Sequence, residues 1–273
     1  IIRPHLLGRG LGRLWIVGLG PGASAWRTPA ASAVLARASD VVGFSGYLDL
    51  AGPLPGDKRR HEFAIGEEEA RVRAALDLAA DGREVALVSS GDAGIYGMAA
   101  LAFEFVEREA AAGWRAVEIS VEPGISALQA AAARAGAPLG HDFCAISLSD
   151  LMTPWPVIEE RLRAVAAADF VVALYNPASR RRRRGLARAM EIFAAARPQD
   201  CPVIVARNLG RAQESVRIMA LGEFDPGTID MLTLVMVGGR ETRLIETGDG
   251  RRVYTPRGYG ARPTAETPKR SLP

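Results

Sequence analysis

The sequence V-S-S-G-D-A-G-I-Y-G at Val88–Gly97 decides the fold of the chain around it. It follows an apolar run, Glu84–Val88, that predicts a buried strand, and it precedes Met98–Glu109, whose apolar spacing predicts a helix. A glycine-rich loop with one acid, Asp92, therefore stands at the carboxyl end of a strand. In open α/β sheets, ligands bind at that edge. Asp92 could be a simple turn or cap residue, or it could belong to a binding site.

Strands and helices alternate on both sides of this loop. In the first half of the chain we expect strands at 14–20, 40–44, 84–90 and 116–121, and helices at 30–38, 67–80, 98–109 and 126–135. Such alternation is typical of a parallel sheet with helices on both faces. The segment Gly46–His61 is rich in Gly, Pro and charge, and we expect a loop there.

The pattern restarts after Gly136–Gly140, a G-A-P-L-G stretch that predicts a hinge. We expect further strands at 142–147, 170–174, 203–206, 214–220 and 232–237, and helices at 157–168 and 186–196. The last two strands have no helix between them, which favours a mixed sheet with antiparallel pairing. Beyond Arg240 the chain is polar and predicts a loosely ordered tail. The expected organisation is an N-terminal α/β domain at 14–138, a C-terminal α/β domain at 139–245 and a polar tail at 246–273.

The composition is that of an ordinary soluble globular protein, with 48% hydrophobic and 24% charged residues and a net charge of +3. The aromatic residues are few and are not interleaved with Lys or Arg, which argues against nucleic-acid binding. No apolar run approaches the roughly 18 residues of a membrane span. Cys144 and Cys201 lie far apart without metal-ligand spacing, so we expect reduced thiols, a cytoplasmic protein and no metal site.

Four loops rich in small residues follow expected strands: Gly18–Gly22, Ser89–Gly97, Pro123–Ala127 and Tyr175–Ser179. If the strands are parallel, these loops converge on one edge of each sheet, which suits a flat or elongated small molecule. The sequence shows no Ser-His-Asp order, no H-E-x-x-H motif and no Walker lysine. It therefore favours group transfer from an activated donor, a reaction that needs positioning more than a protein nucleophile.

Three motifs in this order resemble the signature loops of the tetrapyrrole methylases: G-L-G-P-G (Gly18–Gly22), S-S-G-D-A-G-I-Y-G (Ser89–Gly97) and E-P-G-I-S-A (Glu122–Ala127). These enzymes of the cobalamin and sirohaem pathways use S-adenosyl-L-methionine as methyl donor. The resemblance covers Leu14–Gly239. It implies two α/β domains around a deep cleft, a tetrapyrrole substrate, methyltransferase activity and a homodimer.

Three further stretches resemble the branch of the family that methylates carbon 17 of a precorrin and contracts the ring: Ala135–Asp150, Leu174–Ser179, and Ala206–Arg211 with Glu214–Val216. Two positions depart from the family pattern. Ala23 stands where relatives often carry a polar or acidic residue. Ala93 stands where relatives with G-D-P carry proline, which suits the C17 branch and argues against the C11 and uroporphyrinogen branches.

The resemblance assigns the methyl-donor contacts to Pro21, Gly91, Asp92, Ile95, Ser126, Ala127, Tyr175, Asn176, Leu209 and Thr233. Asp92 and His141 are the acid–base candidates for ring contraction. Asp92 could instead organise its loop, and His141 could be a hinge histidine without a chemical role. Arg180, Arg207 and Arg211 are candidates for binding the substrate carboxylates, although the basic run at 180–184 could equally be a solvated face.

Several alternatives stay open at this point. One is a sister methylase that acts at C11 or C20, or a C17 enzyme whose substrate already holds cobalt. Another is a methylase of RNA or protein, and another a carrier that binds a tetrapyrrole without turnover. The last is a NAD-linked oxidoreductase that uses Gly18–Gly22, although its ribose-binding acid would have to be Asp40, at the wrong end of a strand.

Overall fold

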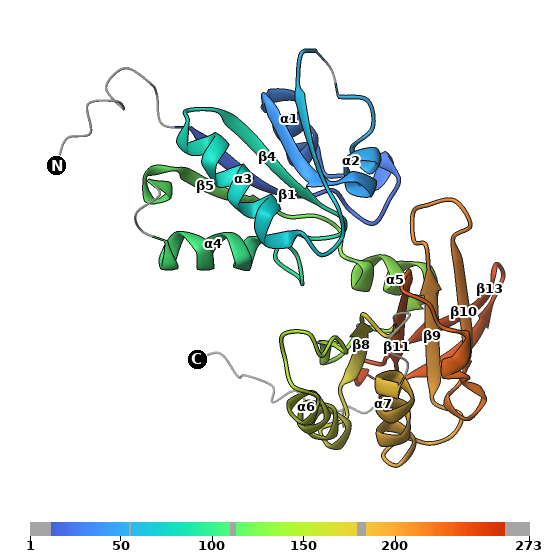
Figure 1. Cartoon of the computed structure of the whole chain (residues 1–273). Coiled ribbons are helices and arrows are strands. Elements are labelled where there is room, and N and C mark those ends of the chain that lie inside the picture. The colour runs from blue at the N-terminus through green and yellow to red at the C-terminus, as the bar shows by residue number, and fades with distance from the viewer. Residues whose placement is uncertain (1–11, 55, 110–112, 179–183, 260–273) are drawn as a thin grey trace, which may run out of the picture. The chain divides into compact units, whose positions relative to one another are not determined.

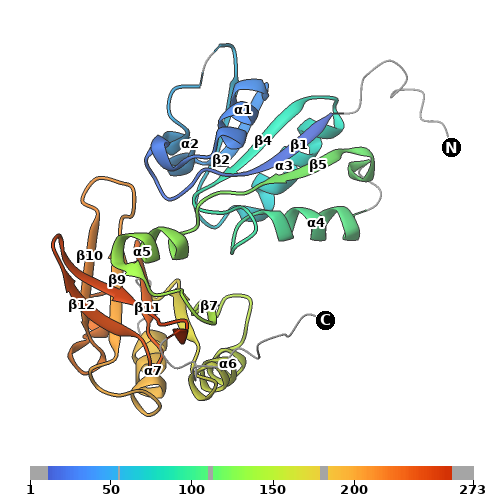
Figure 2. The ribbon, with the colours of Figure 1, turned by 180° about the vertical axis from the view of Figure 1, so that it is seen from behind.

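The computed structural model describes residues 12–54, 56–109, 113–178 and 184–259. The chain divides into two compact units, Ile1–Ala130 with Arg207–Ser215 (unit 1) and Ala131–Ala206 with Val216–Pro273 (unit 2). Figures 1 and 2 show the ribbon from opposite sides. The sequence predicts a boundary between two independently folding domains at residues 138 and 139, and that boundary stays a prediction.

A five-stranded parallel sheet in the order β3-β2-β4-β1-β5 forms the centre of unit 1 (Figure 1). Its strands are β1 (Arg13–Gly18), β2 (Asp40–Phe44), β3 (Arg59–Phe63), β4 (Glu84–Ser89) and β5 (Glu118–Glu122). The parallel N-terminal sheet expected from the sequence is confirmed. Because β4, β1 and β5 are neighbours, the loops that follow them lie side by side at the carboxyl edge of the sheet.

Helices cover both faces of this sheet. They are α1 (Pro29–Arg37), α2 (Ser45–Ala51), α3 (Glu68–Ala80) and α4 (Ala99–Arg108), and α5 (Ala127–Ala135) begins after β5. Side chains alternate between the two faces along a strand. Leu87 therefore packs with Phe105 in the cluster under α3 and α4, whereas Val88 packs with Leu35 in the cluster under α1 and α2.

The prediction of a loop over Gly46–His61 is wrong at both ends of the segment. Helix α2 continues to Ala51, and β3 begins at Arg59. Strand β3 has the sequence R-R-H-E-F and lies at the sheet edge, where charged side chains are favoured because they discourage pairing with other chains. Such a strand lacks the apolar pattern by which buried strands are recognised.

Asp40 is fully buried at the amino end of β2. Its Oδ1 lies 2.8 Å from His61 Nε2 and accepts a hydrogen bond from Arg83 Nη1 at 3.1 Å, and its Oδ2 accepts one from Ser39 Oγ at 2.8 Å. Ligands of parallel sheets bind at the opposite, carboxyl edge. Asp40 therefore cannot bind the ribose of a nicotinamide cofactor there, and the oxidoreductase alternative loses the acid it needs.

We expect Asp40→Asn to lower the free energy of unfolding at pH 7 by about 1–3 kcal/mol, because it disrupts buried charge-assisted hydrogen bonds. Burial raises the pKa of the Asp40 carboxyl, but the hydrogen bonds from His61, Ser39 and Arg83 outweigh it and hold that pKa below 3.8. A carboxyl with a lowered folded-state pKa contributes stability that is complete above its unfolded pKa and is lost as the pH falls through the folded value.

Urea unfolding at pH 7 and below about pH 4 measures both effects. The wild type should lose more stability on acidification than the Asp40→Asn variant does. Equal losses in the two proteins would contradict the assignment of acid-sensitive stability to Asp40.

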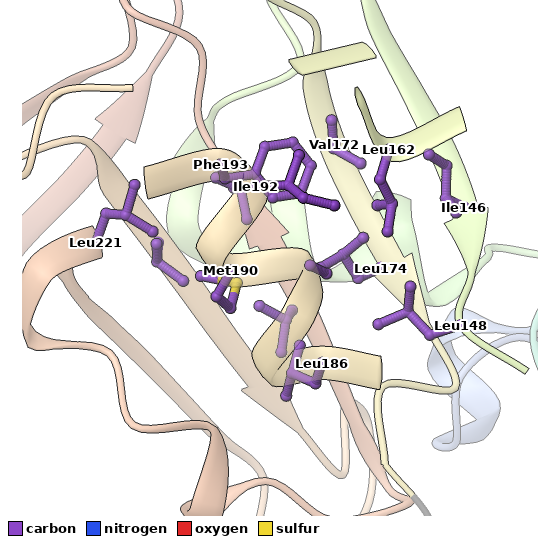
Figure 3. Close-up of a cluster of buried hydrophobic side chains, with 14 of the residues drawn as sticks. Ile146, Leu148, Leu162, Val172, Leu174, Leu186, Met190, Ile192, Phe193 and Leu221 are labelled. Carbon is purple, nitrogen blue, oxygen red and sulfur yellow. The ribbon is translucent and has the colours of Figure 1, made fainter. Parts of the chain in front are cut away.

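Unit 2 is built on a mixed sheet in the order β10-β9-β11-β8-β7. Its strands are β7 (Phe143–Ser147), β8 (Val171–Tyr175), β9 (Pro202–Arg207), β10 (Ser215–Ala220) and β11 (Thr233–Val237). Strand β8 pairs parallel with β7 and antiparallel with β11, which confirms the mixed C-terminal sheet. Helices α6 (Trp155–Ala167) and α7 (Arg184–Ala194) pack on one face, where Leu162, Leu186 and Phe193 meet Leu174 (Figure 3).

The prediction of a loosely ordered tail beyond Arg240 is wrong for the described residues. Strands β12 (Arg243–Thr247) and β13 (Gly250–Tyr254) form an antiparallel hairpin, and β13 pairs parallel with β6 (Gly136–Ala137), within the expected hinge. Strand β12 is exposed along its whole length, so no apolar pattern marks it. The signal that could have found it is the two-residue Gly248–Asp249 turn, which is typical of hairpins.

Candidate functional site

The loops after β1 and β4 are joined by backbone hydrogen bonds. Gly20 N donates to Gly91 O at 3.0 Å, and Gly91 N donates to Gly20 O at 2.7 Å. Both glycines have positive φ, +79° and +72°, a conformation that strains residues with a Cβ. The two glycine-rich loops therefore form one layer at the carboxyl edge of β1 and β4.

The loop after β5 joins this layer with no side chain between. A Cβ at Gly124 would lie 2.2 Å from Gly91 O and 2.7 Å from Gly18 O, and a Cβ at Gly18 would lie 2.7 Å from Gly91 O. These separations are far shorter than van der Waals contact. This close approach therefore requires glycine at positions 18 and 124, whereas at Gly91 it is the positive φ that favours glycine.

Asp92 uses both carboxylate oxygens to hold this layer together. Oδ1 accepts hydrogen bonds from Gly94 N at 2.8 Å and Ile95 N at 3.0 Å. Oδ2 accepts one from Gly124 N at 2.9 Å, which links the loop after β4 to the loop after β5. Of the two roles that the sequence left open for Asp92, these contacts favour the loop organiser over the proton donor.

Ser126 and Ala127 lie where α5 begins. Ser126 is buried, and its Oγ accepts a hydrogen bond from Gln129 N at 3.3 Å while Gln129 Oε1 accepts one from Ser126 N at 3.0 Å. This reciprocal capping box fixes the start of the helix. A Cβ at Gly91 would lie 3.8 Å from Ser126 Cα and 4.0 Å from Ala127 N, so the structure brings these three expected donor contacts together.

Arg211 also lies against these loops, although it follows β9 in the chain. Its Nε donates to Pro21 O at 2.8 Å, and its Nη2 donates to Ser90 Oγ at 2.7 Å. Arg211 is half-buried, and burial lowers the pKa of its guanidinium. Its neighbour Leu209, an expected donor contact, is buried in the same segment of unit 1.

In unit 2, strand register brings the other expected donor contacts to one edge of the sheet. Strand β11 pairs antiparallel with β8, with Val235 opposite Leu174, so the start of β11 at Thr233 lies toward the end of β8, which Asn176 follows. Asn176 has a positive φ of 51°, and its Nδ2 donates to Ser147 Oγ, at the end of the neighbouring strand β7, at 2.9 Å.

Tyr175 and Thr233 complete this edge. Tyr175 pairs with Ser147 in the register of β8 and β7, and Leu148 N donates to Tyr175 O at 2.9 Å. Thr233 is buried, and its Oγ1 donates to Asp230 Oδ1 at 2.7 Å. Sequence reasoning missed Ser147 and Ser90 as supporting residues; the only available signal was a small polar residue at the end of a strand.

Other expected site residues lie elsewhere or are not described. His141 is exposed and precedes the amino end of β7, whereas Tyr175 and Asn176 lie at the carboxyl end of the parallel strand β8. Its Nδ1 lies 3.7 Å from Asp142 Oδ2. Arg207 is half-buried at the end of β9. Arg180 lies outside the described residues.

Neither cysteine is activated for chemistry. Cys144 is half-buried and Cys201 buried, and burial raises the pKa of each thiol to about 11, so neither is a reactive thiolate near neutral pH. Among residues 12–54, 56–109, 113–178 and 184–259, no cluster of three or more His, Cys, Asp or Glu side chains could hold a metal ion. No helix within these ranges is long and apolar enough to cross a membrane.

Comparison with known proteins decides the family. The profile described as Tetrapyrrole (Corrin/Porphyrin) Methylases matches residues 13–225, which include all three glycine-rich loops of unit 1. The chain belongs to the tetrapyrrole methylase family. It is thus a methyltransferase of the S-adenosylmethionine-dependent class, as the resemblance of its loops implied.

Two relatives of this tetrapyrrole methylase match nearly end to end. The precorrin-3B C(17)-methyltransferase of Sinorhizobium sp is 45% identical over 249 residues, which cover 91% of this chain and 97% of that protein. The probable cobalt-factor III C(17)-methyltransferase of Salmonella typhimurium is 46% identical over 246 residues, which cover 90% of this chain and 99% of that protein.

Solved structures confirm the tetrapyrrole methylase fold. The crystal structure of the methyltransferase CobJ has a TM-score of 0.83 and 40% identity, and the match covers 90% of this chain and all of that chain. A uroporphyrin-III C-methyl transferase from Thermus thermophilus, solved in complex with S-adenyl homocysteine, shares the fold at a TM-score of 0.61 and 22% identity, covering 83% of this chain and 92% of that chain.

Proposed function

We propose that this enzyme methylates C17 of precorrin-3B and contracts the macrocycle to the corrin ring, which forms precorrin-4 in cobalamin biosynthesis. The supporting observation is the layer of three glycine-rich loops that Asp92 ties together, in a chain that spans 97% of a precorrin-3B C17-methyltransferase. The cytoplasmic location expected from the sequence and the homodimer implied by the family resemblance stay predictions.

The described residues fit S-adenosyl-L-methionine as the methyl donor. A Cβ at Gly91 would meet Ser126 Cα at 3.8 Å without a clash, so the backbone of this loop is not crowded there. The carboxylate of Asp92 already accepts three amide hydrogen bonds. We assign the donor site to the ten residues that the family resemblance indicated: Pro21, Gly91, Asp92, Ile95, Ser126, Ala127, Tyr175, Asn176, Leu209 and Thr233. When bound, the donor supplies an electrophilic methyl group on a sulfonium.

The chain itself must align the reactants and exclude water. The attacking atom is a ring carbon of the substrate, so no protein nucleophile is required, and a rigid backbone layer supplies the positioning. Because both oxygens of Asp92 are occupied by backbone amides, we assign it to holding that layer rather than to moving protons during ring contraction. Arg207 and Arg180 stay candidates for binding the substrate carboxylates, and His141 stays an untested acid–base candidate.

A cobalt-loaded substrate is the second candidate. The similarity to the Salmonella typhimurium protein, a probable cobalt-factor III C(17)-methyltransferase at 46% identity, favours it as strongly as the Sinorhizobium relative favours the metal-free substrate. Parallel incubations with precorrin-3B and with cobalt-factor III, followed by product mass and methyl position, would separate the two.

The first test is calorimetric titration with S-adenosylhomocysteine, with NAD in a parallel cell. We expect saturable binding of S-adenosylhomocysteine alone. Binding of NAD alone would contradict the proposal, as would methylation at C11 or C20 instead of C17. Tetrapyrrole binding without turnover in the presence of the methyl donor would instead support the carrier alternative.

We expect Asp92→Ala to weaken S-adenosylhomocysteine binding about tenfold or more, because it removes the acceptor of three backbone hydrogen bonds. Asp92→Asn keeps one acceptor oxygen and should show an intermediate loss in the same titration. Asp92→Asn with wild-type affinity but no turnover would contradict this role and identify Asp92 as a proton donor.

A further inference from the structure

We propose that Arg211 is a positioning residue for the methyl-donor loops and not a ligand of the substrate carboxylates. It acts through Pro21 and Ser90, which it holds in place. This inference rests on the proposed function, because it concerns the donor site of that reaction.

The guanidinium of Arg211 bridges two of the three loops. Its Nε donates to Pro21 O at 2.8 Å in the loop after β1, and its Nη2 donates to Ser90 Oγ at 2.7 Å in the loop after β4. A guanidinium is planar and rigid, so two hydrogen bonds from one such group fix the spacing of their acceptors. Arg211 therefore sets the separation of Pro21 and Ser90, next to the expected donor contact Gly91.

The aliphatic part of the Arg211 side chain packs on the loop after β1. A Cβ at Gly22 would lie 2.6 Å from Arg211 Cγ and 2.4 Å from Gly210 O. Gly22 itself is buried. The Arg211 side chain thus packs directly on the backbone of Gly22, which leaves no room for a side chain at that position.

Hydrogen bonds within residues 208–214 fix the backbone of the segment that carries Arg211. Asn208 and Gly210 both have positive φ, 52° and 68°. Arg211 N donates to Asn208 O at 2.9 Å, and Gly210 N donates to Glu214 Oε2 at 2.7 Å. Glycine adopts positive φ freely, but for Asn208 this conformation is sparsely populated; such backbone persists where its surroundings determine it, and it is concentrated at functional sites.

The chemistry of these contacts argues against carboxylate binding. Both hydrogen-bond acceptors, a carbonyl and a hydroxyl, are uncharged, and two of the three guanidinium nitrogens are used on them. An arginine that captures a carboxylate does so with parallel N–H donors directed at the ligand. Arg211 instead directs Nε and Nη2 at the protein's own loops.

The test uses Arg211→Lys, Arg211→Ala and Ser90→Ala in the full chain. Calorimetry gives the Kd of S-adenosylhomocysteine, and steady-state kinetics gives kcat and the KM of the tetrapyrrole. We expect both Arg211 variants to raise that Kd about tenfold or more, because a lysine cannot bridge both acceptors, while the tetrapyrrole KM stays within about twofold. Arg217→Ala is the matched control, an exposed arginine on β10 that should leave all three values unchanged.

A double-mutant cycle separates positioning from general loss of structure. Ser90→Ala removes one acceptor of Arg211, so we expect Arg211→Lys with Ser90→Ala to weaken S-adenosylhomocysteine binding by less than the sum of the two single effects. If Arg211→Ala fails to fold, the Lys variant and the Ser90→Ala variant carry the test.

Two results would overturn the inference. One is a raised tetrapyrrole KM with an unchanged Kd of S-adenosylhomocysteine, which would assign Arg211 to the substrate carboxylates. The other is wild-type donor binding in both Arg211 variants. Failure of the wild-type protein to bind S-adenosylhomocysteine at all would be distinct from both, because it would overturn the proposed function itself.

Discussion

Gly124→Ala is expected to disrupt the donor site more severely than any other single methyl group added to the chain. The new Cβ would lie 2.2 Å from Gly91 O and 2.7 Å from Gly18 O. Both are backbone atoms: Gly18 is the last residue of β1, and Gly91 is hydrogen-bonded to Gly20, so movement of Gly91 would break that pairing. The shift of residue 124 would also pull its N–H away from Asp92 Oδ2.

We expect this overpacking to lower the free energy of unfolding by about 1–3 kcal/mol. The affinity for S-adenosylhomocysteine should fall at least about tenfold, because the expected donor contacts Gly91, Asp92 and Ser126 lie in the loops that would be disrupted. Urea unfolding and calorimetric titration measure the two effects.

The matched control is Gly248→Ala. Gly248 lies in the turn between β12 and β13 and would place its Cβ in open space, so stability and affinity should stay unchanged. Gly124 has no positive φ, so backbone conformation does not complicate the comparison. If Gly124→Ala binds S-adenosylhomocysteine like the wild type, the layer of three loops does not form the donor site.

Arg197→Ala is expected to cause the largest loss of stability. Arg197 is buried in unit 2, where Nη1 donates to Ala166 O at 2.6 Å and pairs with Asp169 Oδ1 at 2.7 Å. Its Nε and Nη2 donate to Gly238 O at 3.3 Å and Phe170 O at 3.2 Å. One side chain thus joins the end of α6, the start of β8 and the end of β11, and burial lowers the pKa of its guanidinium.

Removing it leaves these acceptors without their donor, which should cost about 3–5 kcal/mol. Urea unfolding gives the total loss, and hydrogen exchange shows where it occurs. Peptides that cover β8 and β11 should lose protection, while those that cover β1 and β4 should not.

Two further variants serve as comparisons for the stability loss of Arg197→Ala. Arg197→Lys keeps the charge but not the fork of donors, so its loss should be intermediate. Arg243→Ala removes an exposed arginine that pairs only with Glu241 among the contacts described, and exposed pairs contribute at most about 1 kcal/mol. A loss in Arg197→Ala no larger than in Arg243→Ala would show that the buried network is not needed for stability.

The parts of the fold that the sequence predicts are those with a strong apolar pattern. Strands β1 and β4 are apolar runs, and α3 shows a clear apolar stripe, so each is found close to its observed bounds. Strands β3 and β12 were missed for the opposite reason, because both lie at sheet edges, β12 is exposed along its length and neither carries an apolar run. Pairing with one neighbouring strand stabilises them, and local sequence does not show that pairing.

The sequence predicts some residues of the candidate site but not the contacts between them. The motifs predict that Gly18, Gly91 and Gly124 matter, but their contact follows from the strand order β4-β1-β5, which no motif states. Arg211 was expected to bind substrate because cations suit a substrate with many carboxylates. Its partner Pro21 is 190 positions away in the chain, so only the tertiary structure shows their hydrogen bond.

The segment Arg207–Ser215 has a consequence for how the protein is made. It completes unit 1, yet the ribosome must first synthesise residues 131–206, which belong to unit 2. At roughly 5–20 residues per second, that interval lasts about 4–15 s. During translation, the nascent N-terminal unit therefore waits without Arg211, and its donor loops acquire their full set of contacts only after most of the second unit has left the ribosome.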